Sequence, residues 1–157
     1  MLIALALALQ AVRLVLPLPQ PVSTFVIGSL VHMMLVLTWK LSGLGTALLL
    51  ALLLPLTAYL QGQVLLPLLI PVIWAGNVLF VVLLQLFSAN HRLALFLPPL
   101  AKAVLMGVAA WCVVNIVALP NPALRKTIMF GMSVPQLVTA FIGIWLARQV
   151  FLRIRKF

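Results

Sequence analysis

Hydrophobic residues run almost without interruption along this chain, and proline, glycine and polar residues divide them into six segments. The segments lie near residues 2–18, 23–40, 44–61, 66–88, 94–118 and 128–148. Each is close to the roughly 20 residues that an α-helix needs to cross a bilayer. The apolar runs are continuous rather than alternating, which excludes the strands of a membrane β-barrel. The pattern predicts an all-α integral membrane protein, a single domain over residues 1–157 built as a bundle of six transmembrane helices with short loops.

Composition supports a membrane protein and removes most enzyme chemistry. Of the 157 residues, 66% are hydrophobic and only 6% are charged, with no Asp or Glu at all. Soluble folded proteins need far more surface charge than this. Without carboxylates the chain cannot build a paired-acid site, an Asp-containing triad or a Walker-type magnesium site. We therefore expect no enzyme and no directly bound metal or cofactor, since metal-binding Cys and His motifs are missing too.

The basic residues favour one orientation in the membrane. The net charge of +10 does not indicate nucleic-acid binding, because the cations are scattered between apolar segments instead of clustered on a soluble face. With six crossings both termini share a side, and that side collects Lys40, Arg92, Arg148, Arg153, Arg155 and Lys156. The other side collects Arg125 and Lys126, with Arg13 near the outer end of the first helix. Cytosolic loops carry an excess of Lys and Arg, so we expect both termini in the cytosol. The first segment lacks the basic start of a signal peptide, and "PLPQP" is a poor cleavage site, so we expect a retained helix.

Small and polar residues divide the first helix into two faces. Ala4, Ala8 and Ala11 form a seam at helical spacing, and such seams let another helix approach closely. Gln10 and Arg13 lie on roughly the opposite face. The seam predicts docking on a partner, although an alanine-rich face turned toward lipid would give the same pattern.

Polar residues inside the apolar segments predict a pocket. Intramembrane polar groups usually turn toward partners or a water-filled cavity, and at the predicted orientation these residues fall in the middle or outer half of the membrane. The candidates for substrate binding are His32, Trp74, Asn77, Asn115, Gln136 and Thr139. The alternative is that each only ties two helices together by a hydrogen bond.

Lys102 is expected to stay outside this pocket. Its helical rotation from Asn115 is about 220°, so the two residues cannot share a face. With no carboxylate side chain available, Lys102 is expected to extend toward the cytosolic interface or to pair with carbonyl groups, lipid phosphate or a partner's acidic residue.

Several stretches resemble one known family. The segment "FVIGSLVHMMLVLTWKLSGLGTALLLALLLPLTAYLQGQVLLPLLIPVIWAGNVLFVVLLQLF", with "PPLAKAVLMG" and "VPQLVTAFIG" after it, is similar to the substrate-binding S components of energy-coupling factor (ECF) transporters. The resemblance implies a six-helix bundle in a bacterial or archaeal cell membrane that holds a vitamin-like or other micronutrient near its outer face. It also implies docking, through the Ala4–Ala8 spacing, on a transmembrane coupling subunit driven by two ATPase subunits, which would hydrolyse the ATP.

Two other functions compete with this interpretation. "LQAVRLVLPLP" and "GLGTALLLALLLP" resemble the rod-shape-determining protein of cell-wall synthesis, a membrane scaffold, although that family usually carries an acidic residue where this chain has Pro55. A small pore is less favoured, because polarity gathers in one half of the membrane rather than along a full-length stripe. If the chain binds a solute, the missing carboxylates favour a neutral or anionic one over a cation.

Overall fold

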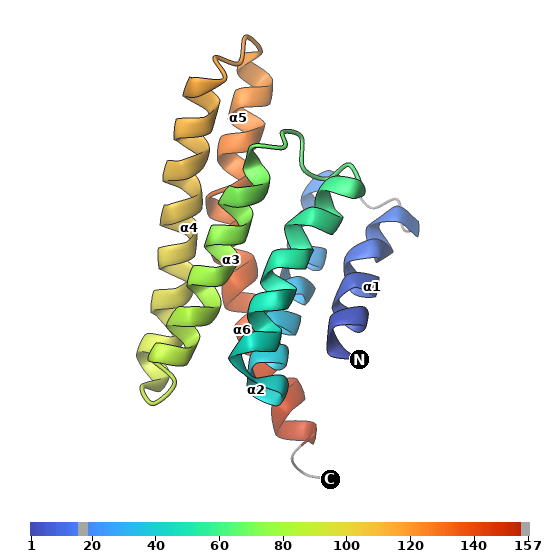
Figure 1. Ribbon diagram of the computed structural model, residues 1–157, viewed down its shortest axis with the longest axis vertical. Helices are drawn as coiled ribbons and strands as arrows, with labels where there is room; N and C mark the ends of the chain where they lie inside the picture. Colours follow the sequence, from blue (N-terminus) through green and yellow to red (C-terminus); the bar gives the residue numbers. More distant parts are fainter. Residues whose placement is uncertain (16–18, 155–157) are drawn as a thin grey trace.

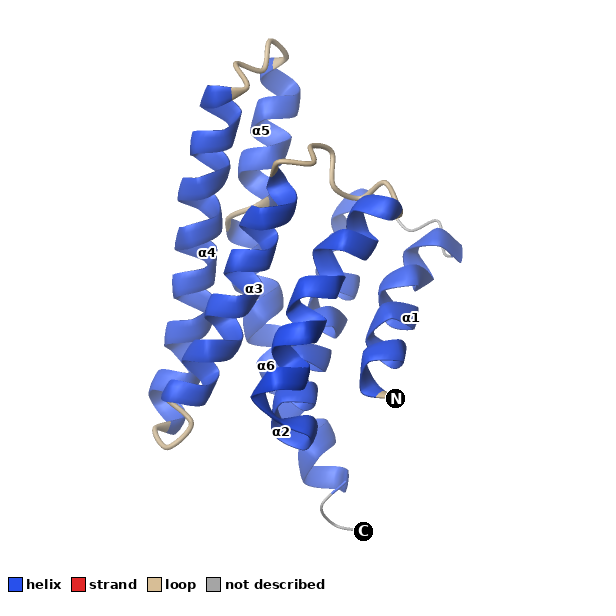
Figure 2. Cartoon of the chain, viewed as in Figure 1, coloured by secondary structure: helices blue, strands red, loops and turns tan. Residues whose placement is uncertain are grey.

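The computed structural model describes residues 1–15 and 19–154, and every regular element within them is helical (Figure 2). The end of the first predicted segment, 16–18, and the cations Arg155 and Lys156 lie outside the described residues. The helices are α1 (Leu2–Val15), α2 (Gln20–Leu60), α3 (Leu69–Leu86), α4 (His91–Ile116), α5 (Pro122–Gly131) and α6 (Val134–Ile154).

Four helical stretches of the described chain are long and apolar enough to cross a membrane. They are Val22–Leu60, Leu69–Leu86, Arg92–Ile116 and Pro122–Ile154, and Leu2–Val15 is a shorter apolar helix. The predicted all-helical, multi-pass membrane architecture is therefore confirmed. The count of six crossings stays a prediction, because α1 has only 14 residues and the other predicted segments are divided differently.

Two predicted segments, 23–40 and 44–61, both lie in α2, whose helical geometry is interrupted at Gly43. A straight helix of 41 residues would be about 60 Å long, twice the thickness of the hydrocarbon core. Gly43 instead has φ 85° and ψ 174°, a conformation far from the helical region. The two halves of α2 lie beside each other rather than end to end (Figure 1), and residues from both halves line the same cavity.

The last predicted segment, 128–148, is interrupted. α5 ends at Gly131 and α6 begins at Val134, so the segment spans a break between two helices. Ser133 Oγ donates to the carbonyl of Met129 at 2.8 Å, which satisfies one of the carbonyl groups freed at the end of α5. The break places the start of α6 beside the interior of the bundle.

α2 is the centre of the bundle and packs against α1, α3 and α6, while α4 packs against α3, α5 and α6. The main core between these helices contains fully buried Leu35, Leu50 and Phe80. α2 and α6 approach closely through glycine: a Cβ added at Gly143 would lie 2.8 Å from the backbone nitrogen of Met33, and one at Gly28 would lie 2.9 Å from Thr139 Cγ2. The close packing fixes the depth and direction of the side chains between them.

Candidate functional site

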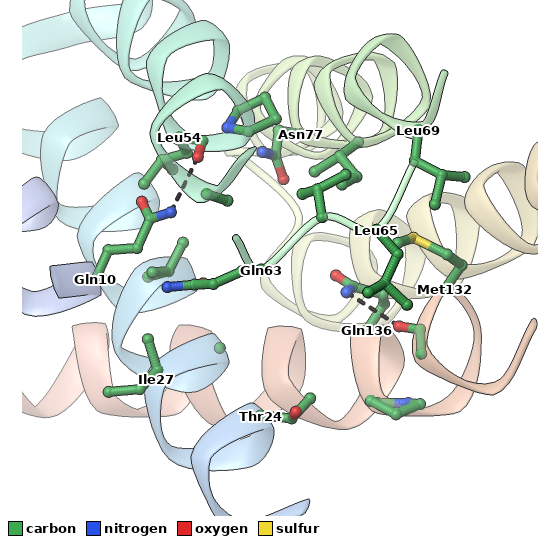
Figure 3. Close-up of a pocket in the computed structure, with 18 of the residues that line it drawn as sticks. Gln10, Thr24, Ile27, Leu54, Gln63, Leu65, Leu69, Asn77, Met132 and Gln136 are labelled. Atoms are coloured by element: carbon green, nitrogen blue, oxygen red, sulfur yellow. Dashed lines mark hydrogen bonds between the residues drawn. The ribbon is translucent and has the colours of Figure 1, made fainter. Parts of the chain in front are cut away.

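A cavity of about 480 Å³ lies among the helices (Figure 3). Both halves of α2, together with α1, α3, α4, the 61–68 loop and the α5–α6 break, contribute to its wall. The loop and α5 are at the end of the bundle away from the start of α1 and the end of α6 (Figure 1). Polar lining side chains from different helices include Gln10, Arg13, His32, Asn77, Lys102 and Gln136.

Lys102 is the centre of the polar cluster in this cavity. Its Nζ donates to Asn77 Oδ1 at 2.6 Å and lies 2.6 Å from His32 Nε2. Its side chain is 1% exposed, and those of His32 and Asn77 are 3% exposed. We name His32, Asn77 and Lys102 the buried basic cluster; it joins α2, α3 and α4 by side-chain hydrogen bonds.

The hydrogen bonds assign the tautomer of His32. Its Nδ1 lies 2.7 Å from the carbonyl oxygen of Gly28, and a carbonyl can only accept, so Nδ1 carries the proton. Nε2 is then the nitrogen that faces Lys102. The ring of Phe80 lies beside both His32 and Lys102. It packs edge to face on the His32 ring, with centroids 5.4 Å apart, and its centroid lies 5.7 Å from Lys102 Nζ.

Two glycines allow close packing around the cluster. A Cβ at Gly76 would lie 2.7 Å from Met106 Sδ, so the bare glycine lets Met106 of α4, about one turn from Lys102, pack closely against α3. Gly143 on α6 makes the same room behind His32, whose backbone carbon would be 3.0 Å from an added Cβ. The sequence pair Gly76-Asn77 thus provides both the close approach of α4 to α3 and one acceptor for Lys102.

Pro55 in α2 leaves a backbone carbonyl group unpaired, and Asn77 points toward it. Pro55 has no N–H, so the carbonyl of Ala51 four residues earlier has no helical donor. Asn77 Nδ2 points to that carbonyl at 3.5 Å, the outer limit of a hydrogen bond. The amide is therefore oriented with its nitrogen toward Ala51 and its oxygen toward Lys102.

Gln10 and Arg13 attach α1 to the cavity wall, as expected for the polar face of that helix. Gln10 Nε2 donates to the carbonyl of Leu54 at 3.0 Å, and its Oε1 accepts from Thr57 Oγ1 at 3.1 Å. Arg13 Nη2 donates to the carbonyl of Ser23 at 3.3 Å. Arg13 Nε is buried and has no hydrogen-bond partner among the described residues.

Two predicted site residues on α6 are separated by the structure. Gln136 lines the cavity, where its Nε2 donates to the carbonyl of Gly131 at 3.3 Å (Figure 3). Thr139 is 2% exposed and packs on Gly28, with its Oγ1 donating to the carbonyl of Pro135 at 2.7 Å. Thr139 therefore holds α6 against α2 and does not line the cavity.

Two other predicted site residues lie outside the cavity. The side chain of Trp74 is 42% exposed. Asn115 is also exposed, near the carboxyl end of α4. Its Nδ2 donates to the carbonyl of Trp111 at 2.9 Å, and its Oδ1 accepts from Arg125 Nη2 of α5. Asn115 thus joins α4 to α5 instead of facing a solute.

The expectation that Lys102 stays outside the pocket is wrong. The helical-wheel argument correctly separates it from Asn115, but Asn115 is the residue that lies elsewhere. Because the partners of Lys102 come from α2 and α3, only a tertiary contact could reveal them. The sequence did offer one signal for Lys102. A lysine inside an apolar segment usually faces the interior of the bundle, and no carboxylate side chain in this chain could pair with it elsewhere.

The alanine seam of α1 faces outward. Ala4 and Ala8 are exposed and Ala11 is partly buried, whereas Ala6 and Gln10 on the other face are buried against the bundle. Within residues 1–15 and 19–154, no group of three or more metal-ligating side chains is present. The seam remains free for another helix, and the cavity offers hydrogen bonds and positive charge.

Comparisons with known proteins identify no relative. A scan against protein-family models, a search of curated proteins and a search of solved structures each give no match to this chain. The functional assignment therefore depends on the residues and geometry described above.

Proposed function

We propose that this chain is the substrate-binding S component of an ECF-type importer, which captures a vitamin-like or other small micronutrient outside the cell. The observation that supports it is a cavity of about 480 Å³ with convergent polar groups inside an apolar helical bundle. Solute-binding pockets typically measure about 300–1,000 Å³ and combine apolar walls with a few polar groups. A scaffold has no need of such a hollow.

In this proposal the chain crosses a bacterial or archaeal cell membrane six times with both termini in the cytosol. The crossings are α1, the two halves of α2 on either side of Gly43, α3, α4, and α5 together with α6. The start of α1 and the end of α6 are away from the end that carries the 61–68 loop (Figure 1). Lys40 and Arg148 line a second, smaller cavity with Ser88, remote from that loop, and their positive charge favours a cytosolic position for this end.

The energy for import would come from partner subunits. The chain has no Asp or Glu with which to hold magnesium and ATP. In the proposal, a transmembrane coupling subunit driven by two cytosolic ATPases docks on α1. The exposed small side chains of Ala4 and Ala8 would let a helix of that subunit approach closely.

The docking face can be tested by purifying the tagged chain from its native membrane in mild detergent. We expect a complex with a membrane subunit and two ATPases, identified by mass spectrometry through their own Walker motifs. Ala4→Leu with Ala8→Leu should remove all three partners without unfolding the chain, because both positions are exposed. Ala123→Leu, at an exposed position on α5, is the matched control and should leave the complex intact.

Two outcomes contradict the proposal. A complex that survives the double substitution excludes this seam as the docking face. A chain that purifies without ATPases, and without any bound small molecule in native mass spectrometry, favours the scaffold resembling the rod-shape-determining protein.

A further inference from the structure

We propose that the buried basic cluster is an anion-binding site and that the captured solute is a small monocarboxylate with an apolar or uncharged body. The inference deepens the proposed function and rests on it, because it names the class of solute held in the cavity. It is carried by four observations: the missing counter-charge, the surroundings of Lys102 Nζ, a second cation in the same cavity, and the shortage of further donors.

No side chain of this protein can neutralise Lys102. The sequence contains ten Lys and Arg residues and no Asp or Glu, so a side-chain carboxylate partner is excluded for every residue. A buried cation is strongly disfavoured unless it is paired. Inside the helices of a membrane protein, an ionisable side chain usually marks a substrate or ion pathway. A negative partner for a charged Lys102 would therefore come from outside the chain.

The groups around Lys102 Nζ are arranged for an ammonium ion. His32 Nε2, Asn77 Oδ1 and the face of Phe80 are all electron-rich. An ammonium has three N–H donors, and the described residues accept two of them. The third N–H is available to a ligand in the cavity that Lys102 lines.

Arg13 adds a second cation to the same cavity. It lines the wall from α1, and its buried Nε has no partner among the described residues. The remaining wall is largely apolar and includes Phe25, Val31 and Ile73. Two cationic side chains on an apolar wall fit a solute with a negative group and an apolar or uncharged body.

The small number of free donors at the buried basic cluster itself favours a carboxylate over a phosphate. His32, Asn77 and Lys102 lie in the interiors of α2, α3 and α4, where backbone N–H groups are used within the helices. A phosphate ester brings three acceptor oxygens and nearly two charges, more than the one remaining ammonium proton of Lys102 in the buried basic cluster can satisfy. A carboxylate brings two oxygens and one charge.

The test compares matched ligand pairs on the full-length protein in lipid nanodiscs at constant ionic strength. The probes are benzoate with benzamide, hexanoate with hexanamide, and phenyl phosphate, each added at tens of millimolar. We expect at least one carboxylate to raise the midpoint of thermal unfolding more than its amide does, and phenyl phosphate to have less effect. Equal effects of carboxylates and amides, a larger effect of phenyl phosphate, or no effect of any probe would each overturn the inference.

Asn77→Asp is the decisive variant, because it is nearly isosteric and places the missing carboxylate beside Lys102. The internal charge should displace the external one, so carboxylates should bind about tenfold more weakly or worse. Asn115→Asp, the same substitution at an exposed position outside the cavity, is the control and should keep the preference for carboxylates over amides. An unchanged response of Asn77→Asp would overturn the inference; Lys102→Met provides a second variant with the same expected loss.

The two proposals fail in different ways. If a neutral solute remains bound through purification, the anion-binding inference is contradicted, while the proposed solute-binding function is still supported. If carboxylates raise the unfolding midpoint but the chain never assembles with ATPases, the anion-binding inference is supported and the proposed importer function is contradicted.

Discussion

Asn77 Oδ1 on α3 lies 2.6 Å from Lys102 Nζ on α4, so the amide occupies the position of a carboxylate in a buried ion pair. The nitrogen of the same amide points toward the carbonyl of Ala51, which Pro55 leaves without a helical donor. The chain thus holds a cation with a neutral acceptor, and its stability should respond strongly to the charge at residue 77.

Asn77→Asp should stabilise the ligand-free protein. The substitution converts a neutral acceptor of Lys102 into a charged one, and charge-assisted hydrogen bonds are about twice as strong as neutral ones. The loss of the 3.5 Å contact to Ala51 costs little, because that bond is at its outer limit. We expect a gain of about 1–3 kcal/mol in the free energy of unfolding, measured by denaturation in detergent at neutral pH.

A double-mutant cycle with Lys102→Met isolates the pair. In the Lys102→Met background the new carboxylate has no partner, so Asn77→Asp should destabilise instead of stabilise. An equal effect of Asn77→Asp in both backgrounds would mean that the two side chains do not interact.

Gly143→Ala should weaken the contact between α2 and α6. The new Cβ would lie 2.8 Å from the Met33 nitrogen and 3.0 Å from the His32 carbonyl carbon, and backbone atoms cannot rotate away. Overpacking of this kind costs about 1–3 kcal/mol, which thermal unfolding in detergent would measure. Gly45→Ala is the matched control: nothing lies within 4 Å of its Cβ, so it should stabilise α2 by about 0.5–1 kcal/mol. Equal effects at the two sites would contradict this packing.

Gly43→Ala tests the reversal within α2. With φ 85° and ψ 174°, Gly43 occupies a region that is essentially restricted to glycine, where strain costs about 1–3 kcal/mol. No atom lies within 4 Å of an added Cβ, so the loss should come from the backbone alone. Gly43→Asn should be as costly as Gly43→Ala in the same unfolding assay, because asparagine is tolerated in the left-handed helical region but not at this ψ. A harmless Gly43→Asn would indicate a different turn.

Hydrophobic runs predicted the helical membrane architecture well, since length and composition are read directly from the chain. The Gly43 reversal also falls in the gap between predicted segments 23–40 and 44–61. The break at residues 132–133 was missed, because Met132 and Ser133 do not interrupt the surrounding hydrophobicity. Local composition predicts which segments are buried in lipid more reliably than it predicts where a helix ends.

The candidate site was predicted only in part, because helical spacing places residues near each other without fixing which one faces inward. Residues three apart differ by about 60° around the helix. Asn77 faces the cavity while Trp74 is exposed, and Gln136 lines the cavity while Thr139 packs on Gly28. Lys102 was missed because its partners lie on other helices, which no rotation within α4 can reveal.

Gln10→Leu should loosen α1 without disturbing the rest of the bundle. Gln10 is 4% exposed and makes hydrogen bonds to Leu54 and Thr57 of α2, while leucine has a similar volume. Hydrogen bonds between membrane helices contribute about 0.6–2 kcal/mol each, so backbone exchange in α1 should accelerate several-fold. Hydrogen–deuterium exchange resolved by peptide would measure this. Ala8→Leu, on the exposed face of the same helix, should leave the exchange of the isolated chain unchanged. Faster exchange throughout α2–α6 in Gln10→Leu would mean that Gln10 supports the whole bundle instead of the attachment of one helix.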